Sequence, residues 1–340
     1  MRSCSLVAVK RGNITESIHR GSVAVVDHLG VMIASVGDSG MITYMRSAAK
    51  PVQGVAVLEN IPAESLPIST EEIALMVSSH SGEDEHVHIG QQLMAKIALK
   101  ESDLCCGTHF PLNRSAANEL VKKSRKPDVW HCSCSGKHLG MLALAKYMGY
   151  PLKGYYLPDH PVQQIMLKTL AGFTDLVPNE IILGTDGCGV PVFGMSLEKM
   201  ALAFARLVRP VDFKTARKKA CEQICQAMRR HPVIVAGEGR FTTDLILRTG
   251  GKIIAKEGNE GIFCLGVPEK GWGVAVKIDD GSTRAVAPVV MEVLRQLDLL
   301  SAEEQKGFGD HLEPKIINHR KENIGSIKAE FKLQKMESRE

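Results

Sequence analysis

The stretch SVAVVDHLGVMIASVGD, residues 22–38, decides the fold. Runs rich in β-branched residues lie on both sides of the turn signal His28-Leu29-Gly30. Apolar runs of this kind, bounded by a Gly-containing turn, predict strands. A further run, SLVAVKRG at residues 5–12, precedes them. The chain is therefore expected to begin with strands.

The last third of the chain returns to strand patterns. GKIIAKEG (251–258), GIFCLGV (261–267) and GWGVAVKIDDGS (271–282) each predict a strand, and the third carries an Asp-Gly turn signal. A final strand pair is expected around residues 323–325. Strands at both ends predict an α/β (α+β) fold, with a central sheet from N- and C-terminal strands and a helical middle region.

The middle of the chain favours helices. RSAAKPVQGVAVLEN (46–60) tolerates Pro51 if it lies in the first helical turn. A buried strand is expected at 181–183, and PVIVAGEG (232–239) is interpreted as another. We expect one domain with two lobes over 1–334 and a frayed tail at 335–340. Further helices are expected at 71–78, 84–100, 115–124, 138–148, 160–172, 196–207, 212–230, from 242, and at 284–299.

Composition excludes several classes of protein. The 340 residues are 44% hydrophobic and 24% charged, and the net charge is +4. This charge is too mild for a nucleic-acid-binding protein, and no basic block with interleaved aromatics occurs. No apolar run approaches the ~18 residues of a membrane span. The apolar run Leu6–Val9 is too short for a signal peptide, so a cytoplasmic location is expected. The nine cysteines, an odd number, favour reduced thiols.

The strip CSCSGKHLGM, residues 132–141, does not form a phosphate-binding loop. Gly136-Lys137 is followed by His138 where the Walker A pattern requires Ser or Thr. The residue five positions before Gly136 is His131, where the pattern requires Gly. Nucleotide binding therefore has little support.

Ser47-x-x-Lys50 is a possible nucleophile–base pair. Residues three apart share a helix face, so the lysine could accept the serine proton. The same spacing occurs in penicillin-binding enzymes. Alone the motif is weak, because Ser196-x-x-Lys199 also matches it and resembles an ordinary helix start.

SSHSGEDEHVH, residues 78–88, is dense in polar groups. His80, His86 and His88 could indicate a metal site, but side chains two apart on a helix point in different directions. A capping serine followed by acidic residues of a first helical turn explains most of the segment.

Cys134 and Cys188 each lie in a Gly-containing turn beside an apolar segment. Two thiolates bind Zn²⁺ well, but the absence of a Cys-x-x-Cys pair disfavours a zinc ribbon. A site with two cysteines and a less usual ligand, or simply buried thiols, are the two interpretations that remain.

Seven segments together resemble one family, the Rhizobium-type L-asparaginases of the asparaginase II family. The resemblance spans about residues 5–330 and implies a fold similar to that of serine β-lactamases and glutaminases. It also implies hydrolysis of L-asparagine to L-aspartate and ammonia by a homodimer. The segments, in order, are RSAAKPVQ, SSHSGE, CSGKHLGML, GTDGCGVP, AKEGNEGIFCLG, GWGVAVKIDDGS and NIGSI.

The resemblance also implies the site residues. Ser47 and Lys50 match one catalytic Ser-Lys pair, and Ser79 and Lys256 match the second, with Lys252 as the alternative lysine. One zinc ion per chain is implied, and Cys132 is interpreted as a bystander. The zinc ligands implied are Cys134, Lys137 and Cys188, and the substrate-binding residues are Arg46, His138 and Asp186.

The chemistry expected of these residues is amide hydrolysis. A clustered set of cations, Arg46, Lys50, Lys137 and Lys256, is expected to lower one another's pKa values, so that a neutral lysine can act as base. Lysine binds zinc only when deprotonated. Two alternatives stay open: a related amidohydrolase such as a glutaminase, and a non-catalytic protein that binds zinc or an amino acid.

Overall fold

The computed structural model describes residues 3–336. The chain divides into two compact units. The first combines the N-terminal segment up to Ala48, the segment Met195–Arg206 and the C-terminal segment from Arg248. The second combines Ala49–Gly194 and Leu207–Leu247.

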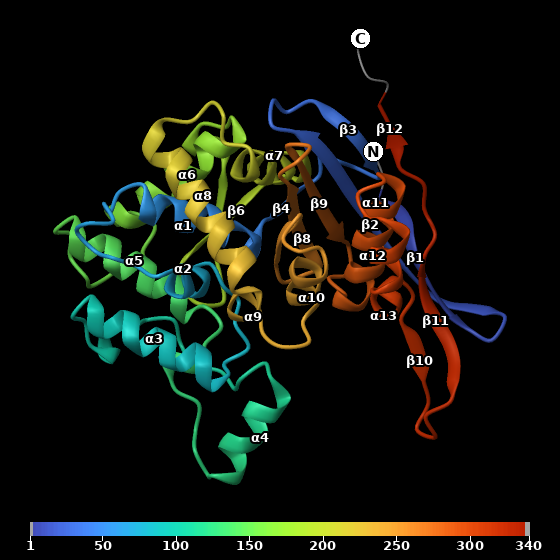
Figure 1. The fold of residues 1–340 in the computed structure, drawn as a ribbon, viewed down its shortest axis with the longest axis horizontal. Helices are drawn as coiled ribbons and strands as arrows, with labels where there is room; N and C mark the ends of the chain where they lie inside the picture. The colour runs from blue at the N-terminus through green and yellow to red at the C-terminus, as the bar shows by residue number, and fades with distance from the viewer. Residues whose placement is uncertain (1–2, 337–340) are drawn as a thin grey trace. The chain divides into compact units, whose positions relative to one another are not determined.

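The first unit is built on an antiparallel sheet with the strand order β10-β11-β1-β2-β9-β8-β7 (Figure 1). In addition, β3 pairs with β2, and β12 pairs with β3. β1 and β2 are flanked by β11 and β9, so N-terminal strands lie between C-terminal ones. This confirms the predicted mixed fold with a sheet from both ends of the chain. The strands of this sheet are β1 (Cys4–Arg11), β2 (Ile14–Asp27), β3 (Met32–Val36), β7 (Ile254–Glu257), β8 (Ile262–Val267), β9 (Trp272–Ile278), β10 (Lys315–Ile317), β11 (Asn323–Ala329) and β12 (Gln334–Lys335). β4 (Ile42–Tyr44) belongs to a separate sheet.

Helices of the first unit pack on this sheet. α11 (Val286–Gln296) contacts β1, β9 and β11. α7 (Leu197–Val208) approaches β9 so closely that a Cβ atom on Gly273 would lie 1.9 Å from the carbonyl oxygen of Ala201. Glycine at 273 is therefore required by this contact. Two short helices that the sequence did not indicate, α12 (Ala302–Lys306) and α13 (Gly309–Leu312), follow α11.

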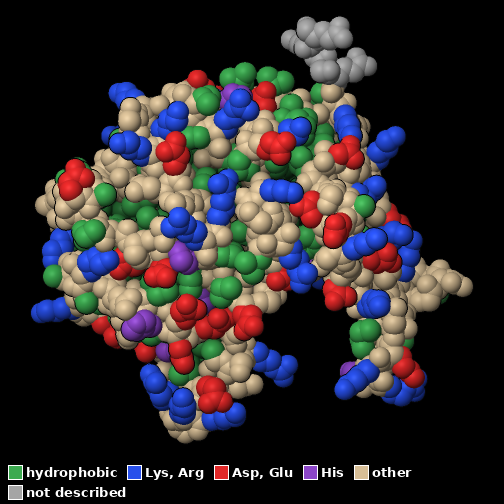
Figure 2. Space-filling model, viewed as in Figure 1, with side chains coloured by type: hydrophobic (Ala, Val, Ile, Leu, Met, Phe, Trp, Pro, Cys, Tyr) green, Lys and Arg blue, Asp and Glu red, His purple; other side chains and the backbone are tan. Residues whose placement is uncertain are grey.

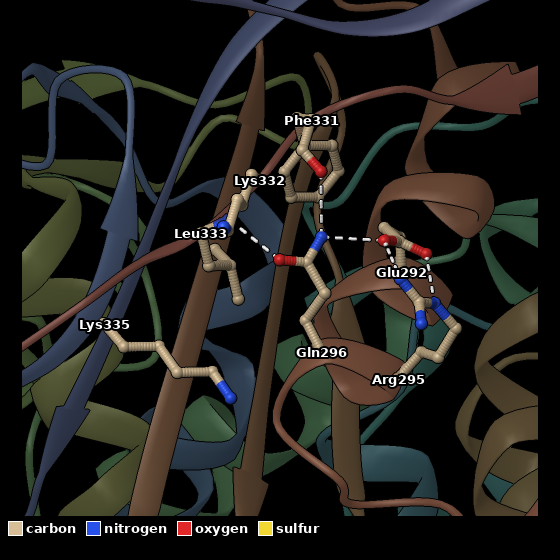
Figure 3. A pocket seen from close by; sticks show the side chains of 7 residues that line it. All are labelled: Glu292, Arg295, Gln296, Phe331, Lys332, Leu333 and Lys335. Carbon is tan, nitrogen blue, oxygen red and sulfur yellow. Dashed lines mark hydrogen bonds and ion pairs between the residues drawn. The ribbon is translucent and has the colours of Figure 1, made fainter.

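The segment after β11 is held by α11. Gln296 donates to the carbonyl oxygen of Phe331 at 2.9 Å and accepts from the backbone N–H of Leu333 at 2.8 Å (Figure 3). β12 then pairs with β3, with Lys335 opposite Ala34. The strand thus includes the first residue of the tail expected to fray, and residues 337–340 of that tail lie outside the described residues.

The second unit is mainly helical. α1 packs against α2, α5, α6 and α8. A Cβ atom on Gly54 would lie 2.5 Å from the side chain of Val77 and 2.8 Å from that of Ile224, so the glycine permits this packing. The helices are α1 (Lys50–Leu58), α2 (Thr70–Met76), α3 (Asp84–Lys96), α4 (Arg114–Lys122), α5 (Ser135–Tyr147), α6 (Pro161–Thr174), α8 (Thr215–Arg230), α9 (Pro232–Val235) and α10 (Phe241–Arg248).

Three local predictions were wrong. PVIVAGEG does not form a strand, because it begins with the short helix α9, in which Pro232 occupies the first turn. β5 (Ile182–Thr185) pairs with β6 (Pro191–Ser196), but Ile182 and Leu183 are exposed where a buried strand was expected. The expected final strand pair does form, from β10 and β11, but its turn precedes residues 323–325, which lie within β11.

The surface agrees with the composition. Basic and acidic side chains are interspersed on the face seen in Figure 2. No helix within residues 3–336 is long and apolar enough to cross a membrane.

Candidate active site

Lys50 connects three of the sequence motifs. It is the first residue of α1 and is 1% exposed. Its Nζ donates to the carbonyl oxygen of Ser78 at 2.5 Å and to that of Ser133 at 3.2 Å. The Oγ of Ser79 lies 3.1 Å away. The buried amine thus joins the segments RSAAK, SSHSG and CSCSG.

This geometry suits proton transfer. The Nζ of Lys50 has two carbonyl oxygens, those of Ser78 and Ser133, and one hydroxyl as neighbours. An amine with two hydrogens can give both to the carbonyls and direct its lone pair at the Ser79 hydroxyl. Lys50 could therefore exchange a proton with Ser79.

Backbone contacts fix the two serines that follow α2. The Ser78 hydroxyl donates to the carbonyl oxygen of Leu75 at 2.7 Å, and the Ser79 N–H donates to the carbonyl oxygen of Val235 at 2.9 Å. α5 begins beside this segment, because a Cβ atom on Gly136 would lie only 2.1 Å from the Leu75 oxygen. Gly136 therefore brings the start of α5 against the end of α2.

A second cluster contains the predicted zinc ligands. The Nζ of Lys137 lies 3.1 Å from the Sγ of Cys188 and 3.9 Å from an Oδ of Asp186. Cys134 precedes α5 and is buried. A tight turn presents Cys188, since Gly189 has a φ of +86° and donates its N–H to the Asp186 carbonyl oxygen at 2.9 Å.

The charges in this cluster are coupled. Hydrogen bonds from the thiols of Cys132 and Cys188 lower the pKa of Cys134 well below its ordinary value. Burial alone would lower the pKa of Lys137, but attraction to Cys134, Cys188 and Asp186 outweighs it and raises that pKa. The clustered cations were predicted to lower the pKa of Lys137, but it is raised, because the neighbouring thiols and carboxylate dominate.

The donor atoms suit zinc chemically. The pKa of Cys134 is lowered by hydrogen bonds from the Cys132 and Cys188 thiols, and the Cys188 thiol and the Lys137 amine lie together in a buried position. Two thiolates and a deprotonated amine would leave one tetrahedral position open. Within residues 3–336 no three His, Cys, Asp or Glu side chains are grouped so that they could hold a metal ion. The lysine is thus essential to the predicted set, and zinc binding stays a prediction.

Cys132, interpreted from the sequence as a bystander, contacts the predicted zinc ligand Cys134. It donates to the carbonyl oxygen of Cys106 at 3.3 Å, and its hydrogen bonds to the Cys106 and Cys134 sulfur atoms raise its own pKa. The Cys-x-Cys spacing of 132 and 134 was the signal for this contact in the sequence. No sequence spacing indicated the contact of Cys106 with Cys132, because only the fold brings these two residues together.

Two histidines of SSHSGEDEHVH, His80 and His86, pack within the second unit. His80 lies 2.9 Å from the Ser135 hydroxyl and stacks on His86, with ring centroids 5.0 Å apart. Burial lowers the pKa of His80 well below its ordinary value. Glu83 is the residue before α3, and acidic residues 84 and 85 occupy its first turn. The capping interpretation agrees with this arrangement, although the cap is Glu83 and not a serine.

His138 has an unsatisfied ring nitrogen. Its Nδ1 lies 2.6 Å from the hydroxyl of Tyr155, whereas its Nε2 is buried without a hydrogen-bond partner among the described residues. Burial lowers the pKa of His138 to about 3. Tyr155, which no motif indicated, thus holds the imidazole of this predicted binding residue.

The remaining predicted residues belong to the first unit. Ser47 is half-buried in the 3-10 helix η1 (Arg46–Ala49). Lys256, in β7, is fully buried and donates to the Glu257 carbonyl oxygen at 2.9 Å. Lys252 is 65% exposed and forms an ion pair with Glu304 at 2.8 Å. The buried position favours Lys256 over Lys252.

Comparison with known proteins identifies the family. The family model L-asparaginase II matches residues 7–329, nearly the whole chain. The chain belongs to the L-asparaginase II family. No curated protein matches the chain.

Solved structures match only remotely. A β-lactamase from Mycobacterium bovis has 13% identity and a TM-score of 0.41, with 86% of this chain and 95% of that chain covered. A Bacillus glutaminase has 12% identity and a TM-score of 0.37, with 82% and 91% covered. The native form of Mglu has 14% identity and a TM-score of 0.36, with 83% of this chain covered. The chain spans 61% of the length of that Mglu chain.

Proposed function

We propose that this protein is an amidohydrolase, specifically an L-asparaginase, which hydrolyses L-asparagine to L-aspartate and ammonia. The observation that carries the proposal is the buried Lys50 amine, 3.1 Å from the Ser79 hydroxyl and three residues after Ser47 in continuous helical backbone. Membership of the L-asparaginase II family supports the choice of substrate.

In the proposed reaction Ser47 is the nucleophile. Its Oγ attacks the side-chain carboxamide carbon while Lys50 accepts the hydroxyl proton. Lys50 and Ser79 then return a proton to the nitrogen, so that ammonia leaves and a β-aspartyl ester remains on Ser47. Water hydrolyses the ester, and the same groups carry its proton. Lys256 is the second lysine of this proton-transfer set.

The other predicted residues bind and organise. Arg46 and the neutral His138 would bind polar groups of the amino-acid substrate, with Asp186 as the third binding group. Cys134, Lys137 and Cys188 would hold one Zn²⁺, which supplies Lewis acidity and a fixed charge when bound. We further propose a cytoplasmic homodimer.

An ammonia-release assay tests the proposal. Asparagine and glutamine are supplied separately, with and without added zinc, to the wild type and to Ser47→Ala. We expect ammonia from asparagine with the wild type only. A faster rate with glutamine would identify a glutaminase instead, and wild-type turnover by Ser47→Ala would contradict the assignment of the nucleophile. Zinc retained without ammonia release from either substrate would indicate a non-catalytic protein.

A further inference from the structure

The turn between β7 and β8, residues 258–261, lies against the backbone that leads to Ser47. A Cβ atom on Gly258 would lie 3.1 Å from the carbonyl oxygen of Met45. The Oε1 of Glu260 lies 4.0 Å from an Nη of Arg46, the next residue. The turn therefore contacts the two residues that immediately precede the proposed nucleophile.

Lys277 fixes this turn to β9. Its Nζ donates to the carbonyl oxygens of Glu260 and, at 2.9 Å, of Ile278. Lys277 is 8% exposed. The backbones are also closely packed, because a Cβ atom on Gly261 would lie 2.8 Å from the Cβ of Ile278. The position of Glu260 is thus set from the sheet.

Both members of the charged pair have an unfavourable backbone conformation. Arg46 has a φ of +51° and Glu260 a φ of +61°, in the left-handed region that favours glycine. Non-glycine residues persist there when the surrounding structure holds them, and they cluster at functional sites. The pair itself adds little to stability, since Glu260 is 69% exposed in its side chain and the ion pair is long. Its side chains are therefore better explained by a role at the site than by folding.

We infer that Glu260, held by Lys277, is a positioning residue that orients the guanidinium of Arg46 for the substrate's α-carboxylate. The inference rests on the proposed function, in which Arg46 binds the substrate. A guanidinium binds a carboxylate best through two parallel hydrogen bonds, which require a fixed orientation. Glu260 opposite one Nη supplies that orientation without contacting the substrate.

Two substitutions of Glu260 separate positioning from folding. Glu260→Gln removes the charge and keeps the shape, and Glu260→Gly also relieves the left-handed backbone. We expect both to raise KM for asparagine roughly two- to fivefold, with kcat nearly unchanged. This factor is the free energy typical of an exposed ion pair, converted to a change in affinity. Glu260→Gly should keep or raise the Tm. Glu304→Gln, which breaks the Lys252 ion pair in the same unit, is the matched control and should leave KM unchanged.

Lys277→Met gives an independent readout. It removes the donors that hold the Glu260 and Ile278 carbonyls, so we expect a lower Tm and a KM at least as high as in Glu260→Gln. A wild type that turns over asparagine, with an unchanged KM in both Glu260 variants, would overturn the inference and leave the proposed function intact. A wild type without turnover of asparagine would overturn both.

Discussion

Gly136→Ala is expected to destabilise the protein and damage the site together. The new Cβ would lie 2.1 Å from the backbone oxygen of Leu75, more than ~1 Å inside an ordinary contact. A backbone atom cannot yield by a rotamer change, so α5 and the end of α2 must separate. Overpacking of this kind costs up to about 3 kcal/mol, and the better helix propensity of alanine returns about 1 kcal/mol. The expected net loss is therefore about 2 kcal/mol.

Gly140→Ala is the matched control in the same helix. Its Cβ would meet the flexible Cε of Met76 at 3.3 Å and the side chain of Val57 at 3.5 Å. A small adjustment accommodates these contacts, so the helix-propensity gain should leave stability unchanged or slightly higher. The two variants should therefore differ by about 2–3 kcal/mol in the free energy of unfolding.

The measurements are urea unfolding and ammonia release. The Leu75 oxygen affected by Gly136→Ala also accepts hydrogen bonds from Ser78, whose own carbonyl accepts from Lys50. We expect turnover to fall in Gly136→Ala, measured below the unfolding transition, and to stay near wild type in Gly140→Ala. Equal stability of the two variants would refute the close approach of α5 and α2 on which this reasoning depends.

Three further outcomes are expected. Ser47→Ala should abolish turnover and leave the Tm unchanged. Ser196→Ala, in the other Ser-x-x-Lys match, should retain turnover. Turnover by Ser47→Ala would contradict the mechanism. Elemental analysis should find no zinc in Lys137→Arg, although the positive charge is kept. Lys146→Arg, in the same helix, should contain as much zinc as the wild type. Zinc in Lys137→Arg would contradict the predicted ligand set. Burial lowers the pKa of His80, so that in acid the unfolded chain binds a proton at His80 that the native state does not. The free energy of unfolding is therefore expected to fall as pH drops below about 6.5, by up to about 1.4 kcal/mol per pH unit. In urea titrations at pH 5–7, His80→Gln should lose less stability with acid than the wild type, and parallel profiles would refute this.

The strands of the sheet were predictable because local sequence signals, apolar runs bounded by turns, indicate them. Strand β2 ends and β3 begins around the turn His28-Leu29-Gly30, and β7, β8 and β9 coincide with apolar runs between glycines. PVIVAGEG failed because a short apolar run fits a buried helical turn as well as a strand. The strand β5 forms, but its burial was predicted wrongly, because the apolar side chains of Ile182 and Leu183 lie on the surface.

The site was predictable only where its contacts are encoded by motifs. Lys50 lies beside Ser79, whereas the resemblance paired Lys50 with Ser47 and Ser79 with Lys256. Ser133 and Cys106 contribute backbone oxygens that any residue carries, so no residue type could indicate them. The choice between Lys256 and Lys252 likewise depended on burial, which sequence spacing does not determine.

Adjacent residues connect the two polar clusters of the second unit. The Ser133 carbonyl accepts from Lys50, and the next residue, Cys134, is the predicted zinc ligand. In the proposed enzyme, a shift of Cys134 would move an acceptor of the Lys50 amine, because Ser133 and Cys134 share a peptide bond. Cys132, which precedes Ser133, donates to the Cys106 carbonyl oxygen and holds this segment. If zinc binds at the thiols as proposed, it would act on Lys50 through the position of Ser133, without contacting the scissile amide.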